Sequence, residues 1–276
     1  MRVALAQVDC ALGDVEANLA TAHQVVVEAA ARQADVVVFP ELSLHGYALG
    51  ALPEDRSISA TDPRIAELSA HGPDVLVGFH EDGGLRRYNA AGYLAGGTLR
   101  HTHRKLYLPT YLAWEERKHA SPGHSLRAFD TRHGRAAVLV CNDAWQPVLP
   151  WLAAQDGAEV LYVPANSAAG LASDAVDTQA YWEDLLRHIA RLQQCWVVFV
   201  NRVGTEEGAT FWGGSRVLDP RGEVVGQAPA GREALTVVDI TVAEARRRRR
   251  ELPLLAEARL GLVSREVTRL MHEGVD

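Results

Sequence analysis

Short apolar runs of strand length alternate along the chain with segments of helical periodicity, and this alternation restricts the folds open to it. The segments 35–39 and 159–163 are nearly continuous apolar runs, as expected for central strands that are covered on both faces. Both halves of the chain have this strand–helix–strand content. We therefore expect an α/β fold, a four-layer αββα sandwich of two mixed β-sheets with outer helices. The expected strands are 2–8, 35–39, 74–79, 90–95, 98–102, 126–130, 135–140, 159–163, 196–201, 211–218, 223–227 and 234–239, and the expected helices are 15–32, 62–70, 146–156, 178–194 and 241–250.

The composition is that of an ordinary globular protein, with 47% hydrophobic and 23% charged residues. No stretch of linker composition divides the 276 residues, so we expect one domain over 1–276. The net charge of -7 gives no general attraction to nucleic acid or to an anionic membrane. Three cysteines without CxxC spacing indicate a reducing, cytoplasmic setting, and neither a signal peptide nor a membrane span is expected.

Three chemically distinct side chains follow the ends of predicted strands. Glu41 comes after 35–39, Lys105 comes after the strand near 98–102, and Cys141 ends the apolar run 136–140. A carboxylate, an ammonium and a thiol delivered in this way can form an acid/base, an electrophile and a nucleophile. Taken alone, the cysteine could equally be a small core residue, and the two charges could form a surface ion pair. Cys10 and Cys195 are interpreted as structural, and Cys195 lies in the apolar run before Trp196–Val200.

Several motifs around these residues occur in an order that resembles the nitrilase superfamily of carbon–nitrogen hydrolases, and the resemblance covers nearly the whole chain. They are Phe39–Tyr47, Arg104–Tyr111, Trp114–Gly123, Cys141–Asp143, Asn201–Gly204, Phe211–Ser215 and Asp219–Gly222. The resemblance implies an αββα sandwich, which agrees with the layers expected above.

The same resemblance implies a role for each catalytic candidate. Cys141 would attack an amide carbonyl and form a thioester, with Glu41 as the general acid and base. Lys105 and the backbone N–H of Asn142 would hold the oxyanion. A second glutamate would orient the site, and motif spacing assigns it to Glu116, with Glu115 as the alternative. No cofactor is implied.

The residues after the thiol bear on the substrate. Asn142-Asp143 replaces the tryptophan and glutamate typical of nitrile-cleaving members, which favours amide or carbamoyl substrates. N-carbamoyl-amino-acid hydrolases place arginines next, whereas this chain has Ala144. The segment 105–123 resembles the glutaminase domain of glutamine-dependent NAD synthetases, but no ATP-binding loop follows it. We expect a free-standing amidase for a small linear amide; an N-carbamoyl amine or amino-acid hydrolase and a non-catalytic binding scaffold are the alternatives.

The pocket walls and the partners are less constrained. The substrate-binding candidates are residues that we expect around the thiol, as walls of its pocket, although each could instead be a core or turn residue. They are Tyr47, Tyr111, Asn142, Trp145, Asn166 and Ser167. The resemblance implies a homodimer or a higher homo-oligomer, with about 252–276 as a C-terminal extension in its contacts.

Two further patterns, a pair of alternate histidines and a run of arginines, suggest binding sites, but neither matches a known binding motif. His101 and His103 alternate on a strand and fit no zinc spacing, so we interpret them as a surface pair and expect no metal. The run Arg246–Arg250 would surround a whole helix, so we interpret it as a solvated helix or a subunit contact, with no nucleic-acid partner.

Overall fold

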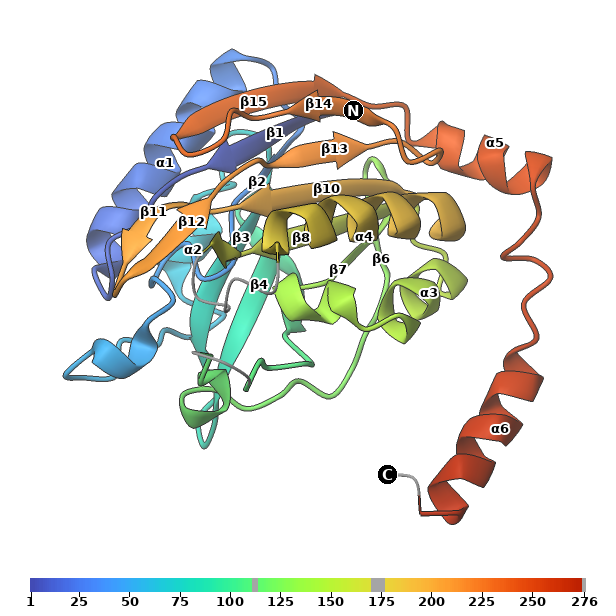
Figure 1. Cartoon of the computed structure of the whole chain (residues 1–276). Coiled ribbons are helices and arrows are strands. Elements are labelled where there is room, and N and C mark those ends of the chain that lie inside the picture. Colours follow the sequence, from blue (N-terminus) through green and yellow to red (C-terminus); the bar gives the residue numbers. More distant parts are fainter. Residues whose placement is uncertain (111–113, 170–176, 275–276) are drawn as a thin grey trace.

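The first β-sheet is built mainly from the N-terminal part of the chain (Figure 1). The computed structural model describes residues 1–110, 114–169 and 177–274. The strands β1, β2 and β3 run parallel, and β15, β4 and β5 pair antiparallel at the two sides. Their order across the sheet is β15 (Ala234–Asp239), β1 (Arg2–Gln7), β2 (Val36–Val38), β3 (Asp74–Asp82), β4 (Arg87–Ala95) and β5 (Thr98–Arg104).

The second sheet repeats this plan, with the parallel strands β7, β8 and β10 at its centre. Its order is β14 (Val224–Gln227), β13 (Arg216–Leu218), β10 (Trp196–Asn201), β8 (Val160–Ala165), β7 (Gly134–Val138) and β6 (Phe129–Thr131). A small third sheet contains β11 (Val203–Glu206), β12 (Ala209–Trp212) and β9 (Ala168–Ala169).

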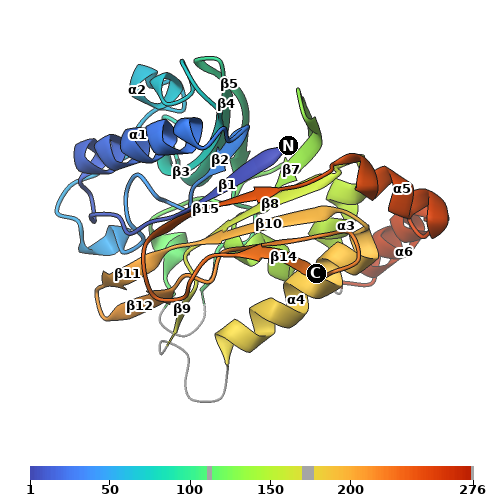
Figure 2. The ribbon, with the colours of Figure 1, turned by 90° about the horizontal axis from the view of Figure 1, so that it is seen from above.

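Helices cover the outer face of each large sheet, so the molecule has the four layers expected from the sequence (Figure 2). The helices α1 (Val15–Ala31) and α2 (Pro63–Glu67) lie on the first sheet, and α3 (Val148–Gln155) and α4 (Thr178–Gln193) lie on the second. Asp14 caps α1, since its side chain accepts a hydrogen bond from the backbone N–H of Ala17 at 3.0 Å. The predicted α/β sandwich of two mixed sheets is confirmed.

The continuous apolar runs are explained by burial on both faces of their strands. In β2, Val36 and Val38 pack into the core between the two sheets, whereas Val37 packs against the α1 side. In β8, Tyr162 faces the core between the sheets and Leu161 faces α3 and α4. No face of either strand is left for a polar side chain.

The C-terminal helices lie at the end of the sandwich. Helix α5 (Ala243–Glu251) is held by its arginines, since Arg246 pairs with Glu159 and Arg249 donates to the carbonyl of Ala158. Part of the arginine run therefore attaches α5 to the rest of the protein. Helix α6 (Leu260–His272) stands apart from the body of the molecule, and none of its residues is buried (Figure 1).

Two sequence interpretations need correction. The segment 211–218 does not form one strand, because Gly213 and Gly214 have positive φ and separate β12 from β13. The predicted surface pair of histidines is wrong. His103 is buried and bonds to Asp143, and His101 stacks on Phe129 with ring centroids 4.2 Å apart. None of the helices in the described ranges is long and apolar enough to cross a membrane.

Candidate active site

Loops at the ends of β2, β5 and β7 bring the predicted carboxylate, ammonium and thiol to one end of the sandwich. Lys105 Nζ donates to Glu41 Oε1 at 2.6 Å and to Glu116 Oε2 at 2.7 Å. All three of these side chains are buried. Glu115 is exposed and pairs with Lys118, so the structure places Glu116 in the cluster and leaves Glu115 outside it.

A close approach of two backbones positions Glu41. The segment that follows β2 crosses Gly78 of β3, where a Cβ atom would lie 2.4 Å from the backbone nitrogen of Leu42 and 2.5 Å from the carbonyl oxygen of Pro40. Only glycine permits this contact without displacement of the chain. The small residue in β3 therefore determines where the carboxylate lies.

Asn89 in β4 joins the two carboxylates and was missed in the sequence analysis. Its Nδ2 donates to Glu41 Oε1 at 2.7 Å and also to Glu116 Oε1. The only signal in the sequence is a polar side chain in a strand of small apolar residues, and its partners lie 48 and 27 positions away. Asn89 thus orients both acids toward the shared ammonium.

The cluster holds two carboxylates against one ammonium in a buried position. Burial lowers the pKa of Lys105, but the negative charges of Glu116 and Glu41 outweigh it and hold that pKa well above its usual value. Burial raises the pKa of Glu116, and the charge of Lys105 opposes this. The lysine therefore remains an ammonium.

Cys141 begins the short 3-10 helix η3 (Cys141–Trp145), which Leu139 and Val140 join to β7, and has a φ of 47°. Positive φ is uncommon for a residue other than glycine and must be imposed by the surroundings. Asp143 supplies this restraint: Oδ2 accepts from the Val140 N–H at 3.2 Å and contacts His103 Nε2 at 2.8 Å. Its Oδ1 accepts from the N–H groups of Leu106 and Tyr107. Asp143 therefore ties the thiol-bearing turn to the chain that follows Lys105.

The thiol of Cys141 is protonated at rest. Its pKa is raised well above the usual value, first by burial and then by the charge of Glu41, while Lys105 and the backbone N–H of Asn166 lower it. Burial also raises the pKa of Cys10 and Cys195, each to about 12. Cys141 lies beside Glu41, whose carboxylate is bonded to the Lys105 ammonium. The carboxylates that act on Cys10 are those of Asp9 and Glu206, both paired with Arg202, and the charge that acts on Cys195 is that of Arg249.

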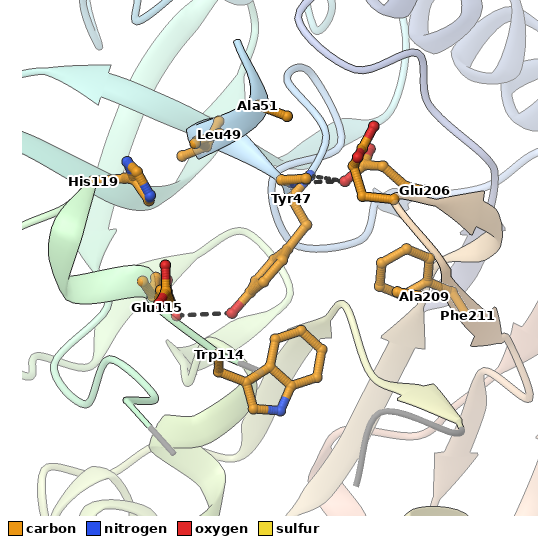
Figure 3. Close-up of a pocket in the computed structure, with 13 residues that line it drawn as sticks. Tyr47, Leu49, Ala51, Trp114, Glu115, His119, Glu206, Ala209 and Phe211 are labelled. Atoms are coloured by element: carbon orange, nitrogen blue, oxygen red, sulfur yellow. Dashed lines mark hydrogen bonds between the residues drawn. The ribbon is translucent and has the colours of Figure 1, made fainter. Parts of the chain in front are cut away.

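A cavity of about 370 Å³ adjoins this cluster (Figure 3). Tyr47 and Trp114 form one wall of the cavity, with their rings edge to face and the ring centroids 5.0 Å apart. Phe211 also lines the cavity. Tyr47 O–H donates to Glu116 Oε2 at 3.3 Å, which connects the cavity wall to the lysine cluster. Glu206 fixes the Tyr47 backbone by accepting its N–H at 2.8 Å.

The other substrate-binding candidates have different surroundings. Asn142 is buried next to the thiol and donates to the carbonyl of Tyr107. Asn166 donates its backbone N–H to Glu41 Oε2 at 2.8 Å. Ser167 accepts from two tryptophan indoles, and Trp145 packs against Tyr181 and Trp182 of α4. Tyr111 lies outside the described residues. In the described ranges no group of three or more histidine, cysteine or acidic side chains could hold a metal ion.

The family model described as carbon-nitrogen hydrolase matches residues 2–250 of the chain. The chain belongs to this family. An amidase from Nesterenkonia AN1, itself a member of the nitrilase superfamily, has the same fold, with a TM-score of 0.82, 24% identity and 96% of each chain covered.

Two curated relatives of this carbon–nitrogen hydrolase differ in length. A glutamine-dependent NAD(+) synthetase from Thermotoga maritima is 32% identical over 261 residues, which are 88% of this chain and 42% of that protein. The chain thus spans less than half the length of that relative. An N-carbamoylputrescine amidase from Arabidopsis thaliana is 28% identical over 242 residues, 81% of each.

Proposed function

We propose that this carbon–nitrogen hydrolase cleaves a small linear amide through a thioester on Cys141 and releases ammonia or an amine. The observation that carries the proposal is the arrangement of Lys105, bonded to Glu41 and Glu116, beside a thiol on whose pKa Glu41 acts. A nucleophile, a proton acceptor and a cation within one buried cluster supply what amide cleavage requires.

The first step is attack on the amide carbonyl. Because the Cys141 thiol is protonated at rest, its proton moves to Glu41 as the S–C bond forms. Lys105 has three N–H donors and uses two of them on the glutamates, so the third can bind the oxyanion together with the N–H of Asn142. One such donor contributes ~3–4 kcal/mol to transition-state stabilisation.

The second step breaks the C–N bond and then the thioester. Glu41 passes its proton to the leaving nitrogen, so that a neutral amine or ammonia departs. Glu41 next takes a proton from water, whose oxygen attacks the thioester carbonyl. The C–S bond then breaks, the acyl group leaves as a carboxylic acid, and Glu41 returns the proton to sulfur to restore the thiol. Glu116 stays a hydrogen-bond acceptor of Lys105, Asn89 and Tyr47, and keeps the ammonium in place through both steps.

A carbamoyl compound is the second candidate substrate. The similarity to an N-carbamoylputrescine amidase over 81% of both chains favours it. Carbamoyl cleavage would release carbon dioxide in addition to ammonia and an amine. The similarity to a glutamine-dependent synthetase makes glutamine a further amide to test.

The test is a panel of short aliphatic amides, glutamine and N-carbamoylputrescine, assayed for ammonia and for carbon dioxide. Cys141→Ala is the blank, because it removes only the nucleophile. We expect ammonia from at least one amide, none with the variant, and an acyl adduct on Cys141 in the mass spectrum of quenched enzyme. Ammonia release that survives in Cys141→Ala would refute the thioester mechanism, and a panel without any turnover would favour the scaffold.

We further propose that copies of the chain associate through α6. Its apolar side chains Leu260, Val263, Val267 and Leu270 share one exposed face, which a partner would cover. Val263→Glu with Val267→Glu should lower the mass measured by light scattering. Arg265→Glu, on the opposite face, is the matched control and should leave the mass unchanged.

A further inference from the structure

Asn166 carries an unpaired carboxamide beside the nucleophile. The residue follows β8 and is 2% exposed, yet neither its Oδ1 nor its Nδ2 has a hydrogen-bond partner in the described part of the chain. Burial of an amide without partners is unfavourable, so nearly all buried amides in proteins are paired. An unpaired one in an enzyme site is suited to a polar group that arrives with the substrate.

The backbone of Asn166 fixes the distance from this carboxamide to the reacting groups. Its N–H donates to Glu41 Oε2 at 2.8 Å and also contacts the sulfur of Cys141. Only the Cα and Cβ atoms separate the carboxamide from that nitrogen, so the carboxamide belongs to the same small region as the base and the thiol.

The neighbouring residues hold Asn166 in place without using its side chain. The Ser167 N–H donates to Asn201 Oδ1 at 2.8 Å, and the Ser167 hydroxyl accepts from the indole of Trp182 at 3.0 Å. Asn201 is the useful contrast, because its Nδ2 also donates to two carbonyls and both its ends are satisfied. The Asn201 side chain is thus bonded within the protein, whereas the Asn166 side chain has no partner among the described residues.

We propose that the Asn166 carboxamide recognises the scissile amide itself, with Oδ1 accepting an N–H of the leaving nitrogen. The carbonyl of a bound amide points to Lys105 and Asn142, which leaves its nitrogen on the side of Glu41. An acceptor within reach of Glu41 would orient that nitrogen to receive the proton. The substrate class is therefore an amide or carbamoyl compound with a free N–H, and esters lose this contact. This inference rests on the proposed function.

The test uses two alkylating probes of Cys141 that differ at the recognised group. Iodoacetamide has the amide N–H groups, and methyl iodoacetate lacks them. We expect Asn166→Leu to slow alkylation by iodoacetamide about tenfold, as for loss of one hydrogen bond, and alkylation by methyl iodoacetate less than about twofold. An equal change with both probes would overturn the inference, even in an enzyme that hydrolyses amides.

Thermal unfolding separates substrate recognition from a structural role. Asn166→Leu removes no hydrogen bond made by the side chain, so its Tm should equal or exceed that of the wild type. Asn201→Leu, the matched control, should lower the Tm because it breaks three buried bonds. If leucine does not fit at 166, Asn166→Ala gives the same comparison of probes. A fall in Tm for both 166 variants would assign the residue to structure instead.

Discussion

Burial raises the pKa of all three cysteine thiols, so neighbouring groups, and not resting ionisation, decide their reactivity. In the proposed site Glu41 accepts the proton of Cys141, whereas the carboxylates near Cys10, Asp9 and Glu206, are both paired with Arg202. We expect iodoacetamide to modify Cys141 at least about tenfold faster than Cys10 or Cys195. Peptide mapping after brief alkylation measures the order, and modification of Cys195 before Cys141 would contradict the assignment of the nucleophile.

Lys105 is also a structural residue, because it is the cation that Glu41 and Glu116 share. Lys105→Met would leave two buried carboxylates without it and should destabilise the fold by about 3–5 kcal/mol. Adding Glu116→Gln removes one of the carboxylates. The double variant should therefore lose less stability than the sum of the losses in the two single variants. Urea unfolding measures each corner of the cycle.

Lys118 provides the control for this cycle. It pairs with Glu115 at the protein surface, and Lys118→Met should hardly change the unfolding midpoint. A Lys105→Met variant as stable as Lys118→Met would mean that the buried ammonium does not stabilise the carboxylates.

At the scale of elements, the contact between β3 and the segment after β2 sets the position of Glu41. Gly78→Ala would force a Cβ against the backbone at Leu42, so we expect a loss of about 1–3 kcal/mol in stability and a larger proportional loss in kcat. Gly72→Ala is the control, because its Cβ would meet nothing closer than 3.7 Å. Equal amidase activity in the two variants would show that this contact does not place the carboxylate.

The strand-end positions of Glu41, Lys105 and Cys141 could be predicted because strand ends are visible in a local apolar pattern. The residues that complete the cluster could not. Asn89 reaches its partners only through the pairing of β4 with β3 and β5, and the register of these strands is set by contacts across the sheet. His103 looked like a surface residue because its partner, Asp143, lies 40 positions later. Local periodicity shows which face a side chain takes but does not show what covers that face.

At the scale of the whole molecule, a buried neutral histidine makes the fold sensitive to acid. His45 Nδ1 accepts the N–H of His80, Nε2 contacts the carbonyl of Arg56, and burial lowers the pKa of His45 to about 4. The unfolded chain therefore binds a proton near pH 6.5 that the folded chain refuses until about pH 4. The contribution of His45 to the free energy of unfolding is fully present above pH 6.5. It decreases by about 3 kcal/mol in total as the pH falls toward 4.

The pH dependence of the unfolding free energy measures this contribution. The slope between pH 6.5 and pH 4 should decrease in His45→Gln, even if that variant is less stable overall. Replacement of His23, which is exposed on α1, should leave the slope unchanged. An unchanged slope in His45→Gln would place the acid sensitivity elsewhere.

The shared ammonium has a consequence for the reaction as a whole. Two carboxylates and one ammonium sum to a single negative charge, and each proposed step only moves a proton among sulfur, carboxylate, nitrogen and water. A neutral amide enters and neutral products can leave, so the buried charge stays constant from one end of the cycle to the other. Turnover at saturating substrate should then be nearly independent of ionic strength, and salt should act only where a charged substrate approaches from solution.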